Sequence, residues 1–350
     1  EGEGEPLAQV RFEHPLSNLS QRYFLRNDPL FSYSEELCAV SRMGGHGSAE
    51  PGSLVVAPLT APGPAWNAVE LARLGLFFRH PTRFLLRERL GLDLDEQLPG
   101  PALDPTVQPA PPLAAALLEI QLQAGGEPVD LHTALQTAGL LPPGRLGEVA
   151  LRLTEEGMVV FARRLREAQT EAVLNPLELE TTVDGIRLMG RLRGVSPEGL
   201  LVFGAMPPGA GDCLDLWLKH LALNLLAPPG VTPVSTWLDP SGGFSLQPVA
   251  EPLPILESLL ALYREGLCQP LHLFPRSALG FARILRGEGE RLPEEVAREI
   301  WLGSGEVTGE ADDPYIRLAF RGEDPLDEAF VMLANRVFGP LLERWRGLRE

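Results

Sequence analysis

Apolar or small residues alternate with polar or longer ones along residues 186–193, the clearest pattern in the chain. A period of two residues is typical of a β-strand with one polar face. The turn residues 195–199 follow, with proline early and glycine late. The apolar run 200–203 is typical of a strand buried on both faces. This pattern predicts a β-hairpin, followed by a glycine- and proline-rich loop and a helix.

Helical periodicity covers much of the remaining chain. Asn67 is expected to cap the first helix. His80-Pro81 should interrupt it, because the residue before proline avoids the α region, and Thr82 should then cap a second helix. The predicted helices are 68–78, 83–90, 113–123, 131–139, 146–169, 214–226, 254–268, 276–286, 293–301 and 325–345. Further short strands are predicted at 244–249, 271–274 and 316–320.

Proline, glycine and serine mark the connections between these elements. Residues 41–65 are rich in all three and predict a flexible loop, and residues 96–112 predict an exposed connection. We therefore expect an extended segment and flexible loop over 1–65. We expect one domain over 66–350, with a helical insertion at about 95–170.

Composition narrows the class of protein. No apolar run reaches the roughly 18 residues of a membrane span. The chain starts at Glu1 without a methionine or a signal peptide, which suggests that it is a piece of a longer protein. The three cysteines are far apart, which excludes a disulfide framework and favours the reducing cytoplasm. Neither cysteines nor histidines have metal-ligand spacing, so no cofactor or metal is expected.

The net charge of −17 excludes a surface that follows a phosphate backbone along its whole length. One stretch differs, since residues 77–90 contain four arginines and a single acid. We predict that Phe77 or Phe78 stacks on a base while Arg79 and Arg83 contact phosphates. The alternative is that the two phenylalanines are core residues.

The order hairpin, loop, helix resembles the core of the RecB-type PD-(D/E)xK nucleases. In that family an aspartate and an Asp-x-Lys end two strands, a Gln-x-x-x-Tyr helix follows, and the carboxylates hold Mg²⁺. This chain places Arg193 and Gly204 at the two aspartates, Met206 at the lysine, and Asp215 and Lys219 at the glutamine and tyrosine. The resemblance therefore implies the scaffold without its chemistry.

Two further blocks match that family. Residues 76–86 are similar to its opening helix, with His80-Pro81 where iron–sulfur members have Cys-Pro. Residues 144–148 resemble its Gly-x-x-x-His helix, with Glu148 in place of the histidine. A residual carboxylate pair of Glu148 and Asp215 is an alternative that would bind a metal.

Blocks at 24–33, 80–81, 141–148, 216–221 and 263–266 together resemble the C-terminal, nuclease-like domain of the RecC family, over about residues 12–350. This resemblance implies an α/β fold of the PD-(D/E)xK type, a mixed sheet flanked by helices, that is catalytically degenerate. It implies a non-catalytic scaffold in exodeoxyribonuclease V, the ATP-dependent RecBCD-type enzyme of double-strand-break repair by recombination. The partners would be RecB-like and RecD-like subunits, and DNA through the local basic patch. The alternatives are an active Mg²⁺-dependent nuclease with non-standard carboxylates and an adaptor that never touches DNA.

Overall fold

The computed structural model describes residues 14–348, except 16, 26–27, 46–53, 56, 95–110, 124–130, 142–143, 169–172, 306 and 322. Residues 46–53 and 56 of the predicted flexible loop and residues 96–110 of the predicted proline-rich connection lie outside the described residues. The chain divides into two units, residues 1–54 with 321–323, and residues 55–320 with 324–350.

The first unit contains a short 3-10 helix, η2 (Gln21–Phe24), and helix α1 (Glu35–Gly45). Residues 35–45, which were predicted to be extended or looped, are therefore helical. The hydroxyl of Ser34 accepts the N–H of Leu37 at 3.2 Å, and two glutamates lie in the first turn. A side-chain cap and acidic residues at this end both stabilise a helix.

The described part of the second unit contains two larger sheets and one short two-stranded sheet. The first is three-stranded, in the order β1 (Ala68–Glu70), β3 (Ile186–Leu192), β2 (Leu177–Val183), with β1 parallel and β2 antiparallel to β3. The tight turn between β2 and β3 is Asp184-Gly185, both at positive φ, as a two-residue hairpin turn requires. Neither β1 nor β2 was predicted from the sequence, and residues 68–70 were expected to be helical.

The second sheet has five strands, in the order β10 (Trp345–Gly347), β7 (Gly242–Leu246), β6 (Ser235–Asp239), β5 (Gly199–Phe203), β4 (Val195–Ser196). The predicted hairpin is correct only at its turn, where Val195 pairs with Leu200. Gly194, at φ +77°, separates β3 from β4, so the two predicted strands belong to different sheets. β5 instead pairs in parallel with β6, and Phe203 at its end is exposed rather than buried.

Most of the predicted helices are confirmed to within a few residues. They are α2 (Leu71–Arg79), α3 (Pro81–Phe84) continued by the π-helical turn η4 (Leu85–Arg89), α4 (Pro111–Gln123), α5 (Leu131–Thr137), α6 (Arg145–Ala168), α7 (Ala210–Leu226), α8 (Pro252–Gly266), α9 (Pro275–Leu285), α10 (Pro293–Leu302) and α12 (Glu328–Arg344). The break at His80 is confirmed, but His80 rather than Thr82 caps α3, since its Nδ1 accepts the N–H of Arg83.

Two predicted strands are wrong. Residues 271–274 are irregular, with all but His272 buried, and residues 316–320 lie largely in helix α11 (Pro314–Ala319). Asp313 starts that helix by accepting the N–H groups of Tyr315 and Ile316, with Pro314 in the first turn. A capping aspartate followed by proline favours a helix start over a strand. Between α10 and α11 lie the two-residue strands β8 (Gly303–Ser304) and β9 (Val307–Thr308) and a 3-10 turn, η6 (Glu310–Asp312).

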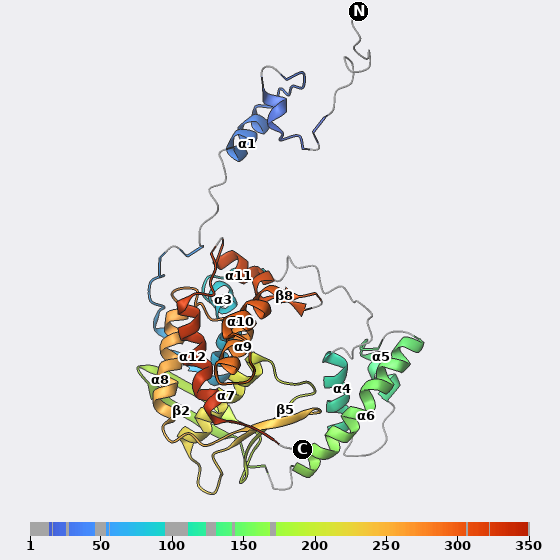
Figure 1. Ribbon diagram of the computed structural model, residues 1–350, viewed down its shortest axis with the longest axis vertical. Coiled ribbons are helices and arrows are strands. Elements are labelled where there is room, and N and C mark those ends of the chain that lie inside the picture. The colour runs from blue at the N-terminus through green and yellow to red at the C-terminus, as the bar shows by residue number, and fades with distance from the viewer. Residues whose placement is uncertain are drawn as a thin grey trace, which may run out of the picture. The chain divides into compact units, whose positions relative to one another are not determined.

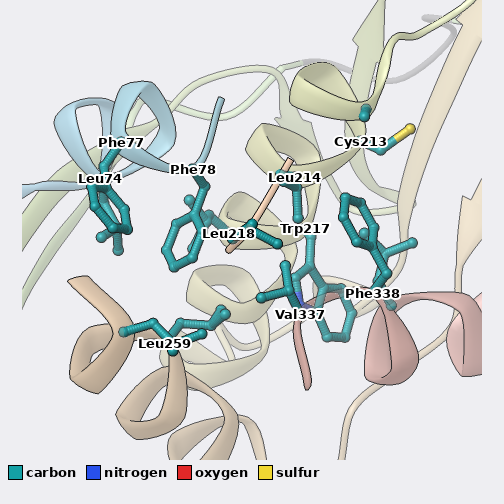
Figure 2. Close-up of a cluster of buried hydrophobic side chains, with 14 of the residues drawn as sticks. Leu74, Phe77, Phe78, Cys213, Leu214, Trp217, Leu218, Leu259, Val337 and Phe338 are labelled. Atoms are coloured by element: carbon teal, nitrogen blue, oxygen red, sulfur yellow. The ribbon is translucent and has the colours of Figure 1, made fainter. Parts of the chain in front are cut away.

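Helix α7 lies at the centre of the main hydrophobic core, with side chains of α2, α8 and α12 around it (Figures 1 and 2). Trp217 and Trp301 are buried. A second core joins α4, α5 and α6 and reaches Leu238 of β6, with Leu201 packed against it. Among the described helices, none is long and apolar enough to cross a membrane.

Candidate functional site

The end of strand β5 carries the position that matches the second aspartate of the nuclease motif. Gly204 occupies it, and a Cβ atom there would lie 2.7 Å from Cζ2 of Trp237, on the neighbouring strand β6. The indole is itself buried and held, since its Nε1 donates to the carboxylate of Asp239 at 3.2 Å. Trp237 therefore fills the space that a side chain at position 204 would need.

Helix α7 carries the positions that match the glutamine and tyrosine. Lys219 Nζ donates to Asp215 Oδ2 at 2.6 Å, one turn apart, and each side chain is about one-third exposed. Asp215 also lies against Gly75 of α2, where a Cβ atom would be 2.9 Å from its carboxylate. The only carboxylate at the matched positions on α7 is thus neutralised by its own helix neighbour.

The remaining matched positions are solvent-facing. Arg193 is exposed just beyond β3, Met206 is exposed beyond β5, and Glu148 is exposed on α6. In the described part of the chain, Glu148 and Asp215 are joined by no hydrogen bond or ion pair. Nor do any three His, Cys, Asp or Glu side chains there form a group able to hold a metal ion.

Phe77 and Phe78 are 0% and 1% exposed, so the prediction that one of them stacks on a base is wrong. Figure 2 shows both rings in the core between α2, α7 and α8. Phe77 makes edge contacts with Phe78 and with Tyr263, at centroid distances of 4.9 and 5.2 Å. Both phenylalanines are therefore core residues, as the alternative interpretation states. Rings of this size contribute a large buried apolar area to the core.

The two arginines predicted to contact DNA lie on either side of the helix break at His80. Arg79, half exposed, forms an ion pair with Asp212 at the start of α7, with Nη2 2.8 Å from Oδ1. Arg83 lies over the ring of Tyr315, 5.4 Å from its centroid. Asp212 could not be identified from the sequence as the ion-pair partner of Arg79, because it lies more than 130 residues away along the chain.

His80 stands where iron–sulfur members of the nuclease family have a cysteine. Its Nδ1 accepts the N–H of Arg83, so Nε2 carries the proton that faces Asp313 at 3.1 Å. Burial raises the pKa of Asp313, but the hydrogen bond from His80 and those from the N–H groups of Ile316 and Tyr315 outweigh it and hold that pKa below its ordinary value. His80 therefore joins α3 to α11.

Comparisons with known proteins identify a family for this chain. The family model of the RecC C-terminal domain matches residues 66–286, which is more than half of the chain. The chain belongs to this family. It is similar to the RecBCD enzyme subunit RecC of Escherichia coli (strain K12), with 26% identity over 333 residues. That match covers 89% of this chain and 28% of the E. coli protein, so the chain spans less than a third of its relative's length.

Proposed function

We propose that this chain is a catalytically inactive, PD-(D/E)xK-type scaffold domain of a RecBCD-type helicase–nuclease in the repair of double-strand breaks. The observation that carries the proposal is Trp237 packed against Gly204, at the position of a catalytic carboxylate. A hard cation such as Mg²⁺ needs oxygen ligands. Gly204 and Met206 supply no side-chain oxygen, and Arg193 supplies only a positive charge.

The family relationship supports a role of this chain in a complex of several subunits. A domain of the RecC family is expected to contact RecB-like and RecD-like subunits, and its role would be to hold them and to guide DNA. The DNA contact that we propose is local and uses Arg79 and Arg83. Arg79 is half exposed, so a phosphate can approach its guanidinium while Asp212 holds it from the other side.

The absence of nuclease activity is tested by incubating the purified chain with linear DNA and either Mg²⁺ or Mn²⁺. We expect no degradation. Metal-dependent cleavage that persists through purification, and that is lost in Glu148→Ala or Asp215→Ala, would instead establish the alternative of an active nuclease with non-standard carboxylates. The matched control is Glu180→Ala, an exposed carboxylate on β2 away from the motif positions.

The assembly is tested by co-expression with the RecB-like and RecD-like subunits of the same organism and gel filtration. We expect one complex that contains all three chains. Elution of this chain alone would contradict the scaffold role. Assembly without any effect of Arg79 and Arg83 on DNA binding would support the adaptor that does not touch DNA.

A further inference from the structure

Helix α6 has two apolar faces, and only one of them is buried. The buried face packs in the α4–α6 core through Leu151, Met158, Phe161 and Leu165. The other face, which we call the α6 stripe, consists of Leu146, Val149, Leu153, Gly157 and Val160. Its four large side chains are 58, 45, 61 and 57% exposed in chain order. Contiguous exposed apolar side chains of this kind mark an interaction site on a soluble protein.

The stripe has the dimensions of a helix-packing seam. Its members are spaced by three, four, four and three residues, so at 100° per residue they fall within an arc of about 80°. From Leu146 to Val160 the stripe is about 21 Å long at 1.5 Å per residue. A Cβ atom at Gly157 would meet no atom within 4 Å, so a partner backbone can approach closely at this point. A narrow, straight seam fits a second helix.

The charges beside the stripe indicate what kind of helix it accepts. Along one edge lie Arg145, Arg152 and Arg163 with a single acid, Glu156, within a chain whose net charge is −17. None of these three arginines forms an ion pair with another described residue. Along the other edge the stripe meets the buried face of α6, near Thr154. The free edge is therefore basic and complements acidic residues.

We infer that the α6 stripe docks an amphipathic helix of a partner subunit, with acidic side chains along the edge that meets Arg145, Arg152 and Arg163. This inference rests on the proposed function, because the partner subunit belongs to the RecBCD-type complex proposed above. A second copy of this chain fits poorly. The two-fold axis of an antiparallel α6 pair would pass beside Leu153, the midpoint of the stripe, and would bring Arg152 against its own copy.

The contact is tested in the complex with the RecB-like and RecD-like subunits by placing the photo-crosslinker benzoylphenylalanine at Leu153. The control position is Leu76 on α2, which is also 61% exposed but stands outside the stripe. We expect crosslinking from Leu153 to a partner subunit. Mass spectrometry should map it to a segment with apolar residues at helical spacing and neighbouring Asp or Glu. The Leu76 control should not yield this peptide.

A second measurement uses Leu153→Glu and Arg152→Glu. We expect Leu153→Glu to weaken the complex at least tenfold, and Arg152→Glu to weaken it by a smaller, salt-dependent factor. Neither change should alter the thermal unfolding of the isolated chain, because both side chains are exposed. The charge control is Arg166→Glu, an exposed arginine of α6 outside the stripe edge, which should leave the affinity unchanged.

The outcomes separate this inference from the proposed function. A complex that forms with unchanged affinity in Leu153→Glu, or a crosslink from Leu153 to a second copy, within the same chain, or to a basic segment, would overturn the α6 contact alone. Failure of the three chains to assemble would overturn both the contact and the proposed function.

Discussion

The imidazole of His220 on α7 is hydrogen bonded to the hydroxyl of Ser235 on β6, with 3.0 Å between Nδ1 and Oγ. Its Nε2 lies 3.0 Å from the carbonyl oxygen of Gln247, which can only accept, so Nε2 carries the proton and Nδ1 accepts from Ser235. Both side chains are fully buried. The neutral ring thereby ties the central helix to the five-stranded sheet.

Burial of His220 predicts a pH-dependent stability. Burial, opposed by the Gln247 carbonyl and assisted by the charge of Arg344, lowers the pKa of His220 from 6.5 to about 4. Between these values the unfolded chain binds a proton that the folded chain does not. The contribution of His220 is therefore complete above pH 6.5 and is lost as the pH falls toward 4, by about 3 kcal/mol in total.

Urea unfolding at pH 7.5 and pH 5 measures this effect. We expect the change in the free energy of unfolding between the two pH values to shrink in His220→Gln relative to the native chain. The control is His132→Gln, an exposed histidine of α5, which should leave the change as it is. Equal pH dependence in His220→Gln and the native chain would show that His220 does not stay neutral.

Filling position 204 should destabilise the fold. In Gly204→Ala the new Cβ would have to displace the Trp237 ring, and overpacking of this kind costs about 1–3 kcal/mol. Gly157→Ala is the matched control, because its Cβ would meet nothing and alanine favours a helix interior by about 1 kcal/mol. Chemical denaturation should move the two midpoints in opposite directions. A stable Gly204→Ala variant would contradict the close packing of Trp237.

Asp313 should stabilise α11 through its cap. Asp313→Ala removes the acceptor of two N–H groups and the partner of His80, and loss of a helix cap costs about 1–2 kcal/mol. Because the pKa of Asp313 is held below its ordinary value, this contribution is present at neutral pH and is lost as the pH falls through the folded-state pKa. Thermal unfolding of Asp313→Ala should be compared with that of Asp312→Ala, the exposed neighbour. Equal melting temperatures would exclude the cap.

Arg79→Ala/Arg83→Ala should weaken binding of DNA ends by the assembled complex. Each phosphate contact contributes about 0.9 to the slope of log affinity against log salt, so the slope should fall by about 1.8 in magnitude. The control is Arg291→Ala/Arg298→Ala, two surface arginines in ion pairs with Glu299 and Asp324. If the salt series gives the native slope for Arg79→Ala/Arg83→Ala, both side chains serve only the internal contacts to Asp212 and Tyr315.

Local signals in the sequence sufficed for most helices. Such signals are the apolar periodicity of α6 and the proline at the start of α8, α9 and α10. They act within one or two helical turns, so they favour a helix whatever distant residues pack against it. The break at His80-Pro81 is equally local. Strand pairing is not local, and β2 and β6 were missed. For β6 the run Thr236-Trp237-Leu238 before Asp239-Pro240 was an available signal.

The sequence by itself determines that Arg193, Gly204 and Met206 stand at the positions that the resemblance matches to the nuclease motif, and that none of the three has a side-chain oxygen able to ligate a metal ion. Only the tertiary structure decided which side chains surround these positions. It brought Trp237 against Gly204 from a strand more than 30 residues away, and it turned Phe77 and Phe78 inward onto Tyr263 and the core around α7. These outcomes depend on long-range packing, because a side chain's exposure is set by the elements that cover it and not by its own neighbours in sequence.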